Sequence, residues 1–311
     1  MRYIIAILLM PALLGIQDLT AQQMPLYSHY ILNYFQINPA IAGSSPCLDM
    51  KIGYRRQWMG IEDGPRTAFG NIHGSFGHKK QNFHGLGGQV YSDNTGLLGY
   101  TGMNLAYAYH MKVSREYMLS VGAGVGFMQY RLDVGGVVLP DVQFLNDPAF
   151  AGGSNDFVFP QIQFGLWLYK KDRFYGFSIQ NVVENNIDIL ANSKLSRHYA
   201  FAAGKAIGMD GGFTFKPSGL LQYVGRSKVS LDGTAMIDYN NKVELGMGFR
   251  SESGLVGLLR LDLFNYVTVA YAYDFALSRI RFDGRNTHEI ILGIHACAKG
   301  DSRAVPCAAY D

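Results

Sequence analysis

The sequence predicts an all-β fold: a transmembrane, up-and-down antiparallel β-barrel of about 14 strands, of the outer-membrane type. Three observations predict it. About fourteen short segments alternate apolar residues with small or polar ones, the pattern of a strand whose two faces have different surroundings. Only 16% of the 311 residues are charged, whereas 37 are Gly, 20 Tyr and 19 Phe, which suits a lipid-facing wall with aromatic girdles. The third observation is an N-terminus with the pattern of a secretory leader.

The segment from Leu98 to His110 shows the alternation clearly. One face carries large apolar side chains, namely Met103, Leu105, Tyr107 and Tyr109. The other carries small or polar ones, namely Gly102, Asn104, Ala106 and Ala108. We expect the first face to contact acyl chains and the second to line the lumen.

Fourteen segments share this pattern. The expected strands are Leu48–Trp58, Arg66–Gly77, His84–Asp93, Leu98–Met111, Glu116–Arg131, Phe157–Lys170, Arg173–Val183, Arg197–Ile207, Gly211–Gly225, Lys228–Tyr239, Lys242–Ser251, Gly254–Phe264, Tyr266–Ser278 and Asn286–Ala296. An even number of strands returns both ends of the barrel to the same side of the membrane.

The connections between these strands differ in length. They are tight at Lys112–Arg115, Lys170–Asp172 and Asn240–Asn241, and long at Leu132–Asp156 and Glu184–Ser196. Because outer-membrane barrels have short periplasmic turns and longer outer loops, we expect both termini in the periplasm and the long loops outside the cell.

Four regions follow from these patterns. Residues 1–21 have a positive start, an apolar core and a small residue at Ala21, which predicts a signal peptide. No later stretch has the roughly 18 apolar residues that a membrane helix needs. Residues 22–46 form an N-terminal periplasmic or plug segment, 47–296 the barrel, and 297–311 a C-terminal tail.

The segment 22–46 lacks strand alternation but is rich in aromatic and aliphatic residues. So many apolar groups favour a packed insert that plugs the barrel or caps its periplasmic mouth over a flexible docking arm. Its candidate residues for contacts inside the barrel are Tyr30, Tyr34, Asn38 and Pro39.

Charged and aromatic residues at the end of the first strand are further lumen candidates. An arginine of the cluster Arg55, Arg56, Gln57 and Trp58 that faces inward can fix the insert by pairing with a carboxylate, for which Asp274 is the candidate. Arg56 is the lumen candidate of this cluster. Trp58 suits an interfacial girdle. Structure alone explains this cluster without a ligand.

The long connection 132–156 is the candidate for partner contact because it is apolar for an exposed loop. Its apolar residues either fold over the barrel mouth or contact a partner; the candidates are Leu139, Phe144, Leu145 and Phe150.

Three cysteines permit at most one internal disulfide. A disulfide between Cys297 and Cys307 would close a loop in the C-terminal tail, and one between Cys47 and Cys297 would join the first and last strands. Free thiols are an equal alternative.

The sequence predicts no catalysis and no cofactor. His288 and Glu289 are adjacent in a strand and point to opposite faces, and no Gly-x-Ser-x-Gly elbow accompanies them. Around one turn, His73, His78 and His84 lack a further ligand at a familiar metal spacing, so no metal site is expected. A net charge of +3 gives no argument for nucleic acid.

The order of particular residues resembles the PorP/SprF family of the type IX secretion system of Bacteroidetes. The most specific part is at the start of the mature chain and the first strand: Tyr27, Ser28, Tyr30, Asn38, Pro39, Ala40, Gly43, Tyr54, Arg56, Gln57, Trp58, Gly60, Ile61, Pro65 and Thr67. Further matches lie at Tyr107, Tyr109, Asp147, Pro148, Gly176, Ser178, Asn181, Pro217, Ser218, Tyr271–Asp274, His288 and Glu289. The tail from Ala296 to Asp311 departs from the family pattern.

The resemblance implies an outer-membrane accessory and anchoring component of the secretion and gliding machinery. Its implied partners are a secreted surface protein with a C-terminal sorting domain, other components of the machinery, a periplasmic peptidoglycan-linked protein, and outer-membrane lipid. The main alternative is a porin-like channel for small solutes, and a third is a soluble β-sandwich adhesin. An open lumen distinguishes the channel from the anchor.

Overall fold

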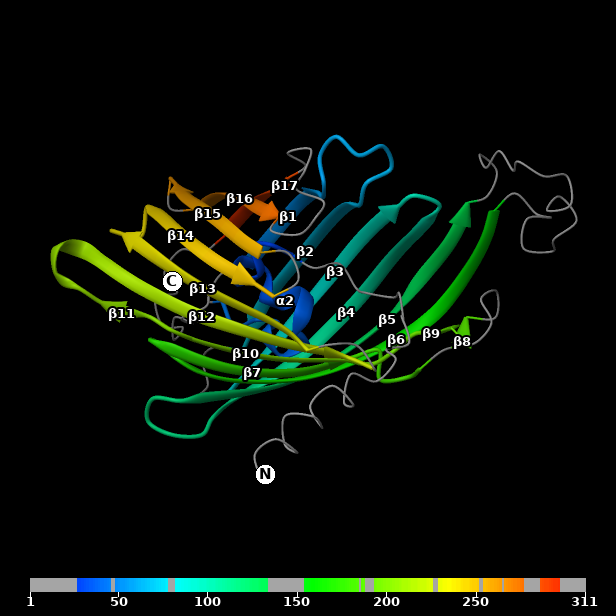
Figure 1. The fold of residues 1–311 in the computed structure, drawn as a ribbon. Coiled ribbons are helices and arrows are strands. Elements are labelled where there is room, and N and C mark those ends of the chain that lie inside the picture. Colours follow the sequence, from blue (N-terminus) through cyan, green and yellow to red (C-terminus); the bar gives the residue numbers. More distant parts are fainter. Residues whose placement is uncertain are drawn as a thin grey trace, which may run out of the picture.

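The chain forms a closed antiparallel β-barrel, as the sequence predicted (Figure 1). The computed structural model describes residues 27–45, 48–77, 82–133, 154–184, 186–187, 193–225, 229–251, 254–264, 266–276 and 286–296. Each long strand pairs with the strands before and after it, and β1 pairs with β17, so that the sheet closes. No helix in this part of the chain has the length and apolarity to cross a bilayer.

Fourteen long strands build the wall. They are β1 (Leu48–Arg56), β2 (Arg66–Phe76), β3 (Phe83–Thr95), β4 (Leu98–Lys112), β5 (Met118–Asp133), β6 (Ser154–Lys170), β7 (Arg173–Gln180), β10 (His198–Lys205), β12 (Phe213–Val224), β13 (Ser230–Tyr239), β14 (Val243–Arg250), β15 (Gly254–Leu263), β16 (Val267–Ala276) and β17 (Thr287–Ala296). Three two-residue strands accompany them: β8 (Asn186–Ile187) pairs with β9 (Ser193–Lys194), and β11 (Ile207–Gly208) pairs with β12.

The predicted alternation is confirmed in the wall. In β4 the outward side chains of Met103, Leu105 and Tyr107 are exposed, whereas Asn104 and Ala106 are buried. Val125 of β5 is 60% exposed although it is fully apolar. A large exposed apolar surface is stable only where lipid covers it, so the outer face suits a bilayer.

Local backbone chemistry moves some strand boundaries from their predicted places. β7 ends at Gln180 rather than Val183 because Asn181 adopts a left-handed φ of 53°. β12 begins at Phe213 rather than Gly211 because Gly211 and Gly212 have positive φ. At the predicted turn, Asn240 and Asn241 have φ of 54° and 52°, the pair of positive values that a tight hairpin requires.

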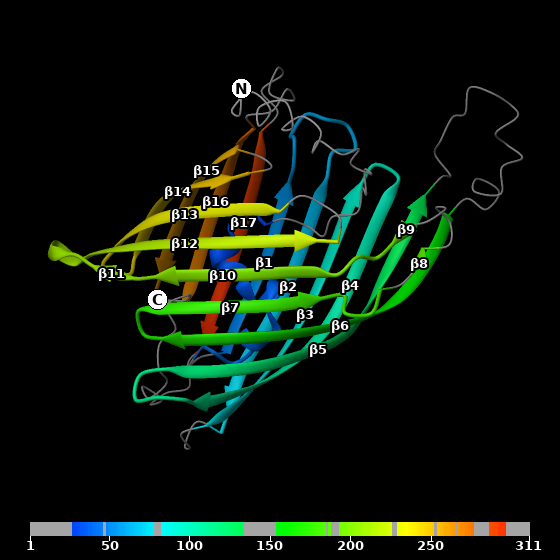
Figure 2. The same ribbon diagram turned by 60° about the horizontal axis from the view of Figure 1, so that its bottom comes forward.

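The two ends of the barrel differ in their connections. The connections 113–117, 171–172 and 240–242 lie at one end, which we call the short-turn mouth; 134–153, 181–197 and 277–286 lie at the other, the long-connection mouth. Leu48 pairs with Ala296, so both ends of the barrel wall meet at the short-turn mouth. β5 and β6 extend beyond β7 at the long-connection mouth (Figure 2), since β6 pairs with β7 only over Phe164–Lys170.

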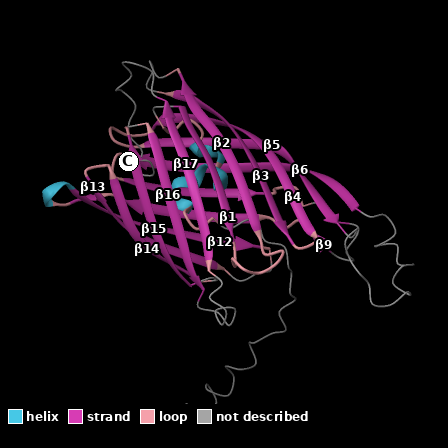
Figure 3. Ribbon diagram, turned by 90° about the horizontal axis from the view of Figure 1, so that it is seen from above, coloured by secondary structure: helices cyan, strands magenta, loops and turns pink. Residues whose placement is uncertain are grey.

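Residues 27–45, the described residues before β1, lie inside the barrel. They form three short helices: η2 (Tyr30–Asn33), α2 (Tyr34–Ile37) and η3 (Pro39–Ile41). Seen from above, the strands surround these helices on all sides (Figure 3). We call residues 27–45 the luminal segment.

Candidate functional site

The lumen is filled by the luminal segment, whose side chains join those of the wall in one aromatic core. Trp167 of β6 is completely buried and stacks on Phe174 of β7, with ring centroids 4.7 Å apart. Tyr34 of α2 packs against both rings, at 5.5 Å from Trp167 and 5.1 Å from Phe174. The insert that the sequence predicted is therefore a plug packed across the barrel.

Glycines of the wall let the luminal segment approach the strands closely. A Cβ atom on Gly122 would lie 2.4 Å from Ala40 Cα, and one on Gly85 would lie 1.8 Å from the carbonyl oxygen of Ala42. Any larger residue at these two positions would therefore push the segment away from the wall.

Side chains of the wall satisfy the backbone of the segment near the short-turn mouth. The carbonyl of Ala42 accepts from His110 Nε2 at 2.8 Å, and that of Ala40 accepts from Ser120 Oγ at 2.7 Å. Since His110 Nε2 must then carry the proton, its Nδ1 accepts from the hydroxyl of Tyr169 at 3.0 Å. These groups are buried, so each bond removes the cost of an unsatisfied polar atom.

Asn38 holds the middle of the segment. Its side-chain amide donates to the carbonyls of Leu166 (3.0 Å) and Phe177 (3.2 Å), and its Oδ1 accepts from Ala40 N as the N-cap of η3. Pro39 follows at the first position of that helix, where its missing N–H costs nothing. Both residues lie buried inside the barrel, as do Tyr30 and Tyr34.

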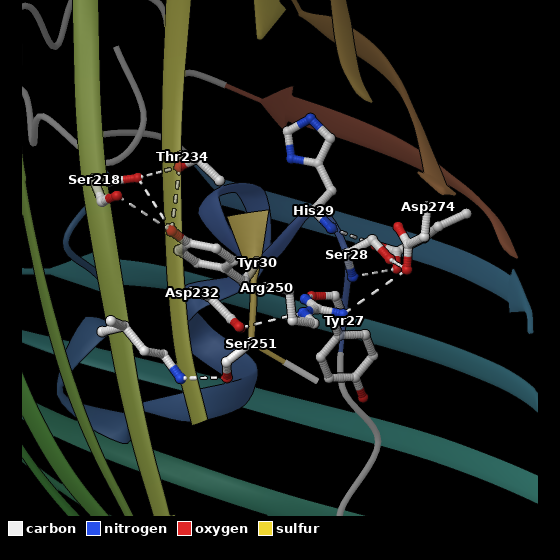
Figure 4. A network of polar contacts seen from close by, with 12 residues as sticks. Tyr27, Ser28, His29, Tyr30, Ser218, Asp232, Thr234, Arg250, Ser251 and Asp274 are labelled. Carbon is white, nitrogen blue, oxygen red and sulfur yellow. Dashed lines mark hydrogen bonds and ion pairs between the residues drawn. The ribbon is translucent and has the colours of Figure 1, made fainter. Parts of the chain in front are cut away.

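Carboxylates hold the other end of the segment at the long-connection mouth (Figure 4). Glu289 accepts from Ser28 N at 2.7 Å and from His29 N at 3.1 Å, one with each oxygen. Asp274 accepts from Ser28 Oγ at 2.8 Å, and Arg250 donates to the carbonyl of Tyr27.

Two arginines neutralise these carboxylates. Arg55 lies 3.0 Å from Asp274 and 4.0 Å from Glu289, and Arg250 lies 3.3 Å from Asp232. We call these five residues the mouth cluster. All are buried, and losing one partner of a buried ion pair costs about 3 to 5 kcal/mol because the other charge is left unpaired.

His29 sits beside this cluster with a buried side chain. Neither ring nitrogen has a hydrogen-bond partner within the described part of the chain.

The luminal segment runs through the barrel from one mouth to the other. Tyr27 begins it at the mouth cluster, which lies at the long-connection mouth, and Gly43 reaches His73 near the short-turn mouth. The sequence predicted both ends of the chain on the same side of the membrane. The two ends of the barrel wall, Leu48 and Ala296, do lie at the same mouth. Tyr27, the first described residue, lies at the opposite mouth. The even strand number fixes only the ends of the wall, and the segment adds one crossing.

The predicted partner of Asp274 needs correction. Arg55, and not Arg56, makes the ion pair, because alternate residues of β1 face the lumen and the side chain of Arg55 has the inward parity. Arg56 is half-buried at the end of β1, and Trp58 is half-buried in the following turn, with a left-handed φ of 51°. Trp58 N donates to Thr287 Oγ1 at 3.3 Å, so neither residue belongs to the filled lumen.

Sequence reasoning missed most of the mouth cluster. Glu289 was considered only as a partner for His288, and Arg55 only as a member of the cluster at the end of the first strand. Asp232 and Arg250 were not singled out. The usable signal is their parity: each is a charged residue on the small-residue face of its strand.

The three histidines around the second turn do not form a site in the residues that the structure describes. His73 faces the lumen and accepts from Gly43 N at 3.3 Å, whereas His84 stacks outside on Phe76. His78 lies outside the described residues.

Several predictions fall on residues that the structure does not describe. These are the signal peptide 1–21, the tail 297–311, the loop candidates Leu139, Phe144, Leu145 and Phe150, and the cysteines Cys47, Cys297 and Cys307.

A closed wall with an apolar exterior and a filled lumen defines an outer-membrane β-barrel. Solved structures agree on the fold: the Pseudomonas putida toluene transporter TodX matches with a TM-score of 0.52 and 10% identity, covering 90% of this chain and 96% of that one. The Ralstonia pickettii toluene transporter TbuX matches with a TM-score of 0.50 and 12% identity, covering 86% and 93%. Residues 19–294 match the family described as type IX secretion system membrane protein PorP/SprF, and the chain belongs to this family. None of the curated proteins compared with the chain matches it.

Proposed function

We propose that the chain is an accessory and anchoring component of the type IX secretion and gliding machinery. In this role it binds a secreted cell-surface protein through that protein's C-terminal sorting domain, and it links the machinery to the outer membrane. It carries out no catalysis and needs no cofactor. The family assignment supports a place in the secretion system.

The filled lumen is the observation that carries the proposal. A solute channel needs a continuous polar path, but the luminal segment contacts the wall on several sides. Tyr34 packs against Trp167 and Phe174 of β6 and β7, and each of these rings is at most 3% exposed. The Tyr30 hydroxyl lies 3.2 Å from Thr234 Oγ1 of β13, and Asn33 accepts from Asn71 of β2 at 2.8 Å. The likeness to toluene transporters supports the fold and not their transport. We therefore place the chain's function in protein contacts at its two mouths.

Orientation belongs to the same proposal. We place the short-turn mouth in the periplasm and the long-connection mouth outside the cell, as in other barrels of this class. Contacts with periplasmic components then form at the short turns, and contacts with the surface protein at the long connections.

Co-purification from native membranes tests the proposal. After mild solubilisation, a tagged chain should retain a secreted protein that carries a sorting domain, and deletion of that domain should abolish its recovery. Recovery of the barrel alone, from cells that secrete the surface protein, would contradict the anchoring role.

A further inference from the structure

The two ends of the luminal segment are held by different kinds of contact. Near the short-turn mouth, Ala40 and Ala42 lie directly against Gly122 and Gly85, with no room for a side chain between them. At the long-connection mouth, the segment is held by side chains of the mouth cluster that accept from Ser28 and His29. The first end is fixed by close backbone packing as well as by hydrogen bonds, whereas the second is fixed mainly by polar groups that another donor can satisfy.

The mouth cluster contacts the segment mainly through chemistry that many peptides share. Glu289 binds two successive backbone N–H groups, Asp274 binds one hydroxyl, and Arg250 binds one backbone carbonyl. Beside the cluster, the Tyr27 ring packs edge-on against Phe69 at 4.9 Å. A peptide with an aromatic residue followed by a hydroxyl residue can therefore make all of these contacts.

Two carboxylate oxygens of the cluster accept no hydrogen bond from the luminal segment. Asp232 Oδ1 and Asp274 Oδ1 have no hydrogen-bond partner in the described residues, and both side chains are about 97% buried. The adjacent His29 ring is likewise unsatisfied and only 1% exposed. A buried polar atom without a hydrogen bond lowers the binding free energy between residues 27–29 and the mouth cluster. A peptide that supplies the missing hydrogen bonds therefore binds more tightly.

We propose that the mouth cluster is a binding site for an extended peptide, and that Tyr27–His29 is its resting occupant. The peptide that fits offers an aromatic residue, then a serine or threonine, with two free backbone N–H groups. When a partner's segment of this kind binds, residues 27–30 leave the cluster while residues 38–45 stay on the wall. The source of the partner peptide rests on the proposed function; the exchange itself does not.

Tyr30 provides a reporter for this exchange. Its hydroxyl lies 3.2 Å from Thr234 Oγ1 inside the barrel, so departure of residues 27–30 uncovers position 234. Ser120, which donates to the carbonyl of Ala40 and is fully buried, reports on the end that stays. A Thr234→Cys chain and a matched Ser120→Cys chain, each with the three native cysteines changed to serine, supply the two probes.

Thiol labelling of the purified full chain with a water-soluble maleimide tests the proposal. Adding Ser28→Ala should raise the labelling rate at position 234 about tenfold, since hydrogen bonds to charged groups are among the strongest in a folded chain. An added peptide with the sequence of residues 27–33 should also raise that rate, and the same peptide with alanine in place of the serine should not. Labelling at position 120 should stay unchanged throughout.

Two results would overturn the exchange. One is a rate at position 234 that neither Ser28→Ala nor the peptide alters, and the other is an equal rise at positions 234 and 120, which means that the whole segment loosens. Ser28 lies outside the strands, so the variant leaves the wall intact, and heat-dependent gel mobility verifies its folding. The assay contains no secreted protein, so its failure is separate from a failure of co-purification.

Discussion

At the residue scale, parity along a strand decides whether a side chain contacts lipid or the luminal segment. Phe164 and Trp167 lie three positions apart on β6, and the first is 50% exposed on the outside while the second is completely buried inside. The same kind of side chain therefore has a different role on each face. Lipid can fill the space left by a truncated outward residue, but no solvent can fill a cavity in the aromatic core.

Trp167→Ala should lower the free energy of unfolding by about 3 to 5 kcal/mol, because it leaves a cavity between Tyr34 and Phe174. Urea unfolding in lipid vesicles, followed by tyrosine fluorescence, measures the loss. Phe164→Ala serves as the control and should cost clearly less. Equal losses for the two variants would mean that the interior is not packed as described.

At the element scale, the luminal segment depends on the glycines that face it. Gly122 lies on the inner face of β5 against Ala40, whereas Gly233 lies on β13 with open space around its Cα. Both are strand glycines, so they share the conformational cost of glycine and differ in their surroundings.

Gly122→Ala should displace the segment from the wall and cost about 1 to 3 kcal/mol, the usual penalty for overpacking. Gly233→Ala should be neutral or slightly stabilising, since alanine is less flexible in the unfolded chain. The midpoint of urea unfolding distinguishes them. A Gly122→Ala protein as stable as the parent would contradict the close approach.

The elements were largely predictable from the sequence, and their interior partners were not. Period-two alternation gave the fourteen long strands and their outward faces, as at Met103 and Leu105, because lipid and lumen demand different side chains. That Arg55 rather than Arg56 faces inward follows from the alternation along β1, in which Asp49, Lys51 and Arg55 share the inner face. That Asp274 is its partner does not follow locally, because Asp274 lies on β16, two strands away. The path of residues 27–45 has no local signal, because its short helices are fixed by contacts with distant strands.

At the scale of the whole molecule, the barrel reverses the usual arrangement of a folded protein. Its large apolar residues cover the outside, and its buried charges, such as those of the mouth cluster, lie inside. The luminal segment supplies the interior with donors and aromatic rings that the wall alone lacks. It also extends from one mouth to the other.

Single-channel recording of the purified full chain in planar lipid bilayers tests the filled lumen most directly. The packed luminal segment predicts a membrane that stays close to its baseline conductance. Openings should become frequent in Gly122→Ala, because that change displaces the segment from the wall. A steady, large conductance from the unmodified chain would contradict the filled lumen and favour a solute channel.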